Sequence, residues 1–197
     1  FADEVVPVTF TTRKGEVTVE HDEQPGKGRP DKIPQLRPAF AKDGTITAAT
    51  SSSISDGAAA VVLSRESVAK ANGQQPVAKI VAMAAHAQEP AQFTVAPIGA
   101  IEKVLDKAGW SADEVELWEV NEAFACVAMF AMRDIGIPHD KINVNGGGTA
   151  LGHPIGASGT RIIVTLLNAL KQQGKKRGVA SLCIGGGEAT AVAVELV

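Results

Sequence analysis

Cysteine, basic charge and long apolar runs are all scarce in this sequence. The two cysteines, Cys126 and Cys183, lie 57 positions apart, which gives neither a disulfide framework nor the spacing of a metal site. We therefore expect no bound metal and a reducing, cytoplasmic compartment. The formal net charge of −3 argues against a nucleic-acid partner. No apolar run approaches the roughly 18 residues of a membrane span, so no membrane partner is expected.

The remaining composition is that of a globular protein, and 197 residues can bury a sizeable core. The sequence opens on Phe1 and reads as though a strand were already under way, so we expect it to begin partway through a larger protein. Residues 1–54 are unlike the rest. They predict two short strands, Val5–Phe10 and Glu16–Val19, followed by a proline- and glycine-rich loop and a third short strand over Thr45–Thr50.

From about residue 58 onward, strand-like and helix-like segments alternate. This pattern predicts an α/β fold with a mostly parallel sheet covered by helices and with ligands at the carboxyl ends of the strands. The last two strands are expected to be antiparallel, because only three glycines and a glutamate separate them. The expected strands are Ala58–Leu63, Val77–Ala84, Val115–Val120, Lys141–Val144, Val179–Ile184 and Ala189–Val197. The expected helices are Ser64–Gly73 with Ser64 as N-cap, one beginning near Pro97, Glu122–Ile135 and Ile155–Gln173.

Three residues with chemical potential follow three of these strands. His153 lies in a glycine-rich run from Asn145 to Gly159, Cys183 ends an apolar strand before Gly185–Gly187, and Asn121 follows the strand ending at Val120. Glycines of this kind mark tight turns or sites where backbone comes close to a ligand. Spacing alone nominates His153 as acid or base and Cys183 as nucleophile, with the Gly185 N–H as an oxyanion donor.

Each of these residues also has a structural interpretation. His153 could bond loop carbonyls, Cys183 could be a buried strand residue, and Asn121 could cap the following helix. Cys126 is expected to pack in the core, and His21, His86 and His139 are expected to be solvated or structural. The glycine run lacks the lysine of a phosphate-binding loop and the spacing of a dinucleotide site, which excludes nucleotide chemistry of those kinds.

Four segments together resemble the thiolase superfamily, and within it the acetyl-CoA acetyltransferase type. They are the serine-rich stretch Thr47–Gly57, Asn121-Glu-Ala-Phe-Ala125, the run Asn145–Gly159 with Gly-His-Pro-Ile-Gly-Ala-Ser-Gly, and Cys183-Ile-Gly-Gly-Gly187. The resemblance covers essentially the whole chain. It implies a layered βαβαβαββ domain together with part of an inserted lid, the C-terminal half of a two-halved enzyme. Residues 1–54 would then belong to the lid, 55–75 to the end of the N-terminal domain, and 76–197 to the C-terminal domain.

The resemblance also implies roles that spacing does not. The acyl-accepting cysteine would lie in the N-terminal half, absent here, and His153 would activate it. Cys183 would act as acid and base on the second acetyl-CoA, while Asn121 (through a water) and His153 would hold the enolate oxygen. The N–H of Gly185 would polarise the acyl-enzyme carbonyl. The positions that would line the coenzyme A pocket are Ser52, Phe40, Ala123 and Phe124, with Lys27, Arg29 and Arg37 as weaker candidates for its phosphates.

The same resemblance sets the expected reaction and partners. The reaction would be Claisen condensation of two acetyl-CoA molecules or thiolytic cleavage of a 3-ketoacyl-CoA, within fatty acid metabolism. Coenzyme A thioesters such as acetyl-CoA and acetoacetyl-CoA would be substrates, with no further cofactor. The other partners would be the N-terminal half and further copies in a homo-oligomer, a dimer or tetramer. Two alternatives from other classes are a non-catalytic coenzyme A- or lipid-binding module, and a fragment that serves only in assembly.

Overall fold

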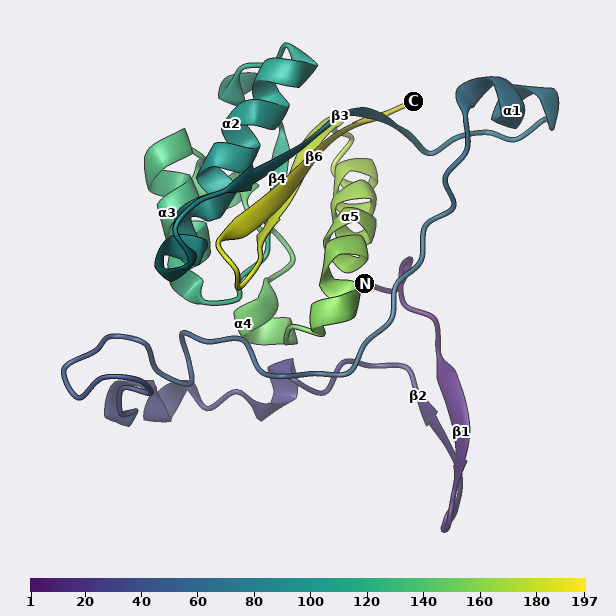
Figure 1. Cartoon of the computed structure of the whole chain (residues 1–197). Coiled ribbons are helices and arrows are strands. Elements are labelled where there is room, and N and C mark those ends of the chain that lie inside the picture. The colour runs from purple at the N-terminus through teal and green to yellow at the C-terminus, as the bar shows by residue number, and fades with distance from the viewer.

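The computed structural model describes residues 1–197 and consists of a packed C-terminal layer with an extended N-terminal segment along one end (Figure 1). The layer is built on a four-stranded sheet with the spatial order β3-β6-β5-β4. These strands are β3 (Ala78–Ala87), β4 (Leu117–Val120), β5 (Arg177–Cys183) and β6 (Glu188–Leu196). The α/β class predicted from the sequence is confirmed.

The prediction of a mostly parallel sheet is only partly correct. The β4 and β5 strands pair in parallel, but β6 is antiparallel to both of its neighbours, β5 and β3. The antiparallel arrangement of the last two strands was expected, because the glycine turn after Cys183 is too short for a crossover. By inserting between β3 and β5, β6 keeps those two strands from pairing with each other directly.

Three segments expected to be strands do not form strands. Residues 58–63 have no strand partner in this chain, and Val62 is 97% exposed. Residues 45–50 form loops and a turn. In the segment 141–144, Ile142 makes a single bridge to Trp118, and Asn143 has a positive φ of 47° that ends the extended conformation.

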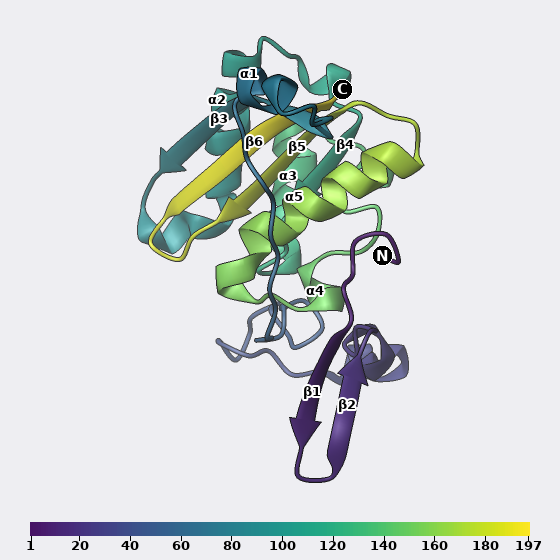
Figure 2. The ribbon, with the colours of Figure 1, turned by 90° about the vertical axis from the view of Figure 1, so that its right-hand side faces the viewer.

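Helices cover the two faces of the sheet unequally. The helices α2 (Ala96–Ala108) and α3 (Ala125–Ile135) lie on one face, and α5 (Ile155–Gln172) lies on the other (Figures 1 and 2). Pro97 stands in the first turn of α2 as predicted, and α2 ends at Gly109 in the left-handed conformation. The short α1 (Glu66–Ala71) has Arg65 as its N-cap rather than Ser64, and the four-residue α4 (Gly148–Leu151) precedes α5.

Alternate side chains of β4 enter two separate hydrophobic clusters. Trp118 joins the larger cluster with Ile101 and Val104 of α2, whereas Leu117 joins the smaller cluster with residues of α5. This alternation follows from the period of two in a strand. Each face of the sheet therefore contributes to a hydrophobic core, and β4 is packed from both sides.

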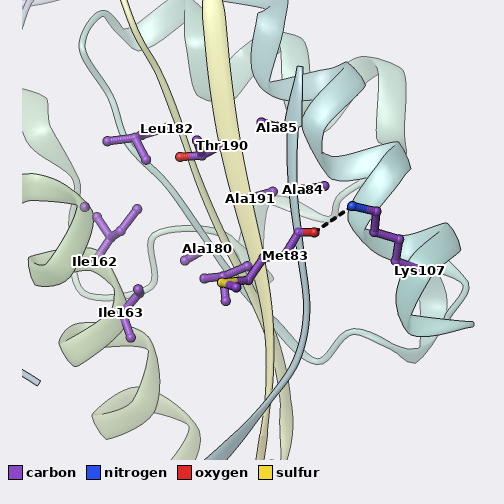
Figure 3. Close-up of a pocket in the computed structure, with 12 residues that line it drawn as sticks. Met83, Ala84, Ala85, Lys107, Ile162, Ile163, Ala180, Leu182, Thr190 and Ala191 are labelled. Carbon is purple, nitrogen blue, oxygen red and sulfur yellow. Dashed lines mark hydrogen bonds between the residues drawn. The ribbon is translucent and has the colours of Figure 1, made fainter. Parts of the chain in front are cut away.

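On the α5 face, β3 and the beginning of β6 remain uncovered, whereas Val194 of β6 packs in the smaller cluster with α5. The uncovered area forms a cavity of about 410 Å³ whose lining is mainly apolar, including Ala191 and Ile163 (Figure 3). Met83 lies beside it with 65% of its surface exposed, and the Lys107 side chain donates to the Met83 carbonyl from across the strand. An apolar sheet face of this kind is expected to be covered in a complete protein.

The N-terminal segment extends away from the layer and then returns beneath it. The two predicted short strands are present as β1 (Val8–Thr12), which lies further along the chain than the predicted Val5–Phe10, and β2 (Gly15–Val19). They pair as an antiparallel hairpin that projects from the layer (Figure 2). Two short 3-10 turns follow, at Pro25–Lys27 and Pro30–Gln35. The chain then passes below α4 toward the ends of β4 and β5. None of the helices combines the length and the apolar character that a bilayer crossing requires.

Candidate active site

The three residues expected to meet at one edge of the sheet come from the ends of β4 and β5 and from the loop before α5. Asn121 follows β4 directly, and its backbone N–H donates to the Ser181 carbonyl at 2.9 Å. This bond continues the parallel β4–β5 pairing and places Asn121 beside the last residues of β5, which ends at Cys183. The Asn121 Nδ2 lies 3.3 Å from His153 Nε2. The predicted convergence of Asn121 and His153 is therefore confirmed.

Hydrogen bonds fix the tautomer of His153. The ring Nδ1 lies 2.6 Å from the Ser158 hydroxyl oxygen, and that hydroxyl donates its own proton to the Pro154 carbonyl at 3.0 Å. The Asn121 amide nitrogen can only donate, so Nε2 accepts from it, and Nδ1 carries the ring proton and donates it to the Ser158 oxygen. His153 thus presents an unprotonated Nε2 in the site, the form needed by a general base.

The electrostatic surroundings also favour neutral His153. Burial is the largest cause that lowers the pKa of His153, and the positive charge of Arg161 lowers it further. Arg161 is itself held near Glu119 of β4, with Nη1 3.6 Å from Oε2. Burial raises the pKa of the Glu119 carboxyl to about 8 despite this arginine. Both residues were missed by the sequence analysis, because a single charged residue in an apolar strand, such as Glu119, or in a helix, such as Arg161, gives no distinct signal.

Asn121 is buried but is not the N-cap of α3. That helix begins at Ala125 with Phe124 as its N-cap, so the capping interpretation of Asn121 is wrong. The Asn121 Oδ1 is buried and has no hydrogen-bond partner within the chain. A buried amide oxygen without a partner is costly, and it is therefore suited to accept from a water or a ligand.

The thiol of Cys183 is 6% exposed and ends β5 as predicted. Burial raises its pKa to about 11. At pH 7 the thiolate is therefore only on the order of 10⁻⁴ of the population, and the resting group is a proton donor. Cys126 lies half-buried in the first turn of α3 and outside the core, contrary to expectation.

The turn after Cys183 leaves the backbone donors of Gly185 and Gly186 free. The Gly187 N–H donates to the Ile184 carbonyl at 3.1 Å, and the Ile184 N–H donates to Glu188 at 2.8 Å. Gly187 has φ +97°, which only glycine adopts easily. The N–H of Gly185 lies within this turn and makes no hydrogen bond in the chain. It is available to an oxygen of a ligand, as the sequence analysis expected.

A carboxylate holds the glycine run against the end of β4. Glu122 Oε1 accepts from Asn143 Nδ2 at 2.7 Å, and Oε2 accepts from the Thr149 N–H at 3.2 Å and from its hydroxyl. A side chain at Gly147 would collide with this carboxylate. The close approach of Glu122 therefore leaves no room for a side chain at position 147 unless the carboxylate moves.

Asn143 explains why its segment is not a strand. Its Oδ1 accepts from the Val120 N–H at 2.8 Å, and its Nδ2 donates to the Val120 carbonyl at 2.9 Å. The side chain thus makes the pair of bonds that a neighbouring strand would otherwise make. The roles of Asn143 and Thr149 were missed, because isolated polar residues in a loop carry no periodic pattern.

The predicted coenzyme A residues come together at the N-terminus of α3. Both the N–H and the hydroxyl of Ser52 donate to the Ala123 carbonyl, at 3.1 and 2.9 Å. The rings of Phe40 and Phe124 pack edge to face, 6.0 Å apart. The segment continues to the site, where the His153 N–H donates to the Ser53 carbonyl at 2.9 Å.

The weaker candidates for phosphate binding lie elsewhere on the N-terminal segment. Lys27 pairs with Glu23 at 3.0 Å and Arg29 with Asp31 at 3.4 Å, both on exposed turns, while Arg37 makes no ion pair. The structure brings none of them into contact with the Ser52 cluster. No group of three or more His, Cys, Asp or Glu side chains is arranged to hold a metal ion.

Two family models match this chain. Residues 74–196 match the family model described as thiolase, C-terminal domain, and residues 1–67 match thiolase, N-terminal domain. An acetyl-CoA acetyltransferase of Yarrowia lipolytica is 50% identical over all of this chain and 49% of its own length. The Rhizobium meliloti acetyl-CoA acetyltransferase is 49% identical over 99% of this chain and 50% of its own length.

Solved structures show the same fold. The Bacillus anthracis acetyl-CoA acetyltransferase superposes with a TM-score of 0.95 at 41% identity, covering 99% of this chain and 50% of that one. A thiolase from Ascaris suum in complex with coenzyme A gives 0.87 at 38% identity, with the same coverage.

The chain spans about half the length of the curated relatives it matches. Because residues 1–67 match the N-terminal family model, the expectation that the whole N-terminal half lies outside this chain is not confirmed. The domain boundaries at 54 and 75 stay a prediction. By its sequence, its fold and both family models, this chain belongs to the thiolase family.

Proposed function

We propose that this chain forms the C-terminal part of an acetyl-CoA C-acetyltransferase, which condenses two acetyl-CoA molecules or cleaves a 3-ketoacyl-CoA. The observation that carries the proposal is the fixed tautomer of His153, whose Nε2 accepts beside Asn121 while Nδ1 donates to Ser158. A binding module would not need a base of this kind. The naming of the relatives as acetyl-CoA acetyltransferases supports the same reaction.

The acyl-accepting thiol is proposed to lie outside these 197 residues. Cys183 rests as a protonated thiol with a pKa of about 11, and burial also raises the pKa of Cys126. Neither is therefore an activated nucleophile. His153 Nε2 would remove the proton of the external thiol, whose sulfur then attacks the thioester carbonyl as the carbon–sulfur bond to coenzyme A breaks. The coenzyme A thiolate leaves with that proton.

In the condensation step, Cys183 acts on the second acetyl-CoA. The Cys183 thiol would first give its proton to His153 Nε2. The resulting thiolate would remove a proton from the α-carbon, and the enolate oxygen would be held by the protonated His153 and by a water on Asn121. The carbanion then attacks the acyl carbonyl, which the free Gly185 N–H polarises, and the carbon–sulfur bond of the acyl-enzyme breaks. The external thiolate leaves and takes its proton from His153. In cleavage the same steps run in reverse, and the Cys183 thiol returns its proton to the α-carbon. The resting thiol is the form that cleavage requires.

Coenzyme A is proposed to lie along the cluster formed by Ser52, Phe40, Ala123 and Phe124. Two aromatic rings and a lid segment bonded to the Ala123 carbonyl provide an apolar wall beside the catalytic edge. The Ascaris suum structure in complex with coenzyme A is consistent with this kind of ligand. No cofactor beyond the thioester substrates is needed by these steps. A cytoplasmic location and a dimeric or tetrameric assembly are further parts of the proposal.

The test uses the full-length protein and a His153→Asn variant. Asparagine keeps a hydrogen-bond donor but cannot act as a base, so acylation should slow by roughly 10²–10⁴-fold. Coenzyme A affinity should stay nearly unchanged, because the proposed cluster lies around Ser52 and Phe124. A burst assay for acylation and a coenzyme A titration measure the two quantities. Normal acylation together with weaker coenzyme A binding would favour the non-catalytic coenzyme A- or lipid-binding module.

A further inference from the structure

A chain of polar side chains at the end of β3 has no role in the reaction described above. Lys103 Nζ lies 3.1 Å from His86 Nδ1, and His86 Nε2 lies 3.0 Å from Gln88 Oε1. An ammonium group can only donate, so His86 Nδ1 is an acceptor and Nε2 carries the proton. That proton is donated to the Gln88 oxygen, whose amide nitrogen donates in turn to the Gln92 carbonyl at 2.9 Å. In this row of hydrogen bonds, the His86 ring N–H and the Gln88 amide each have one defined acceptor.

Packing holds the His86 ring in this position. The ring lies directly over Gly99 of α2, where an added Cβ would stand 2.6 Å from Nδ1. The Lys103 ammonium also lies 3.5 Å from the Ala85 carbonyl. The lysine side chain therefore links α2 to β3 beside the His86 ring. His86 is therefore wedged between α2 and β3, and only a residue without a side chain fits beneath it.

Gln88 connects this chain of bonds to the catalytic edge. Its backbone N–H donates to the Gly187 carbonyl at 3.0 Å. A side chain at Gly187 would collide with the Gln88 carbonyl oxygen and would stand 3.0 Å from the Cα of Pro90. Gly187 closes the turn that contains Gly185. Gln88, which follows β3, is therefore the residue that this turn packs against and bonds to.

We propose that His86, oriented by Lys103, is a positioning residue that holds Gln88 and through it the turn bearing the Gly185 N–H. The inference rests on the proposed function, in which this N–H polarises the acyl-enzyme carbonyl. Loss of the His86–Gln88 bond loosens the turn without removing the donor. The expected fall in kcat is about 10-fold, smaller than the roughly 10²–10³-fold that follows loss of an oxyanion donor.

Two isosteric substitutions in the full-length protein separate the two ring nitrogens. The amide nitrogen of His86→Gln stands near the position of Nε2 and keeps the donor to Gln88, whereas the amide oxygen of His86→Asn replaces only Nδ1. His86→Gln should keep kcat within about 2-fold, and His86→Asn should lower kcat about 10-fold with KM unchanged. Equal kcat values in the two variants would overturn the proposal.

A second measurement does not depend on activity. Hydrogen–deuterium exchange of the peptide covering 184–188 should be faster in His86→Asn than in His86→Gln, while the remaining peptides exchange alike. Should the unmodified protein fail to cleave acetoacetyl-CoA, the proposed function is wrong, and this comparison still decides whether His86 fixes the turn. Equal exchange in both variants would show that it does not.

Gly99 and the lysines of α2 supply the controls. Gly99→Ala should displace the His86 ring and lower kcat when it is the only substitution. Added to His86→Asn it should cause no further loss, because the imidazole ring that it would displace is absent. Lys103→Met should lower kcat, whereas Lys107→Met should not, since Lys107 reaches only the Met83 carbonyl at 3.0 Å. Full additivity of the Gly99 and His86 substitutions, or equal effects of the two lysine variants, would contradict the account.

Discussion

Removing the hydroxyl of Ser158 tests how His153 is held in its reactive tautomer. The hydroxyl accepts from His153 Nδ1 at 2.6 Å and donates to the Pro154 carbonyl at 3.0 Å, and Ser158 is fully buried. In Ser158→Ala, the Nδ1–H loses its acceptor at a position where the side chain is fully buried. The imidazole can avoid this cost only by moving its proton to Nε2, which then no longer accepts a proton from a thiol.

The structure sets the size of the effect. An unsatisfied buried donor costs about 1–3 kcal/mol, which corresponds to roughly 5–150-fold in the population of the reactive tautomer. The acylation rate of the full-length protein should fall by that factor in a burst assay. Coenzyme A affinity should be unchanged, because Ser158 lies within α5, whereas the proposed coenzyme A cluster around Ser52 lies at the N-terminus of α3.

Thr165→Val is the matched control. Thr165 is another buried hydroxyl of α5, and it contacts Glu4 at 3.2 Å rather than His153. Its loss should affect stability but leave the acylation rate within about 2-fold. An acylation rate in Ser158→Ala that equals that of Thr165→Val would refute the assignment of the tautomer.

Two other substitutions test separate parts of the account. Cys183→Ser should abolish exchange of the acetyl α-protons while acyl transfer continues, so labelled acetyl-CoA should leave a trapped acyl-enzyme; absence of any acyl-enzyme would return the nucleophile role to Cys183. Glu119 has a pKa of about 8 when folded against 4.5 for the free side chain, so its contribution to stability is complete below pH 4.5 and is lost as pH rises to 8. Glu119→Gln should remove a decline of a few kcal/mol in unfolding free energy over this range, as followed by denaturant titration at several pH values; an unchanged pH slope would contradict the burial argument.

The catalytic edge could be predicted because strand ends are readable in the sequence. The apolar run before Asn121 and the run ending at Cys183 locate β4 and β5, and parallel pairing then places their carboxyl ends together. His153 was found from its glycine-rich surroundings. The structure adds that one of those glycines, Gly147, lies directly against the Glu122 carboxylate.

The residues that hold the site could not be predicted in the same way. Asn143 and Ser158 act through side-chain bonds across loops, and their positions depend on tertiary packing rather than on local pattern. A partial signal existed for Ser158, since a serine four residues after Pro154 can bond its carbonyl within one helical turn. The apolar residues 58–63 were predicted to form a strand, yet they pair with no strand of this chain. Propensity alone cannot reveal a missing neighbour.

The central claim is that this chain supplies the base, the acid and the oxyanion donors, while the acyl group is carried by a thiol elsewhere in the protein. Its most direct test is to quench the full-length protein during turnover of acetyl-CoA and locate the acetyl group by peptide mass mapping. The account predicts acetylation of a cysteine outside these 197 residues, with Cys126 and Cys183 unmodified. Acetyl label on Cys183 at catalytically competent rates would contradict it.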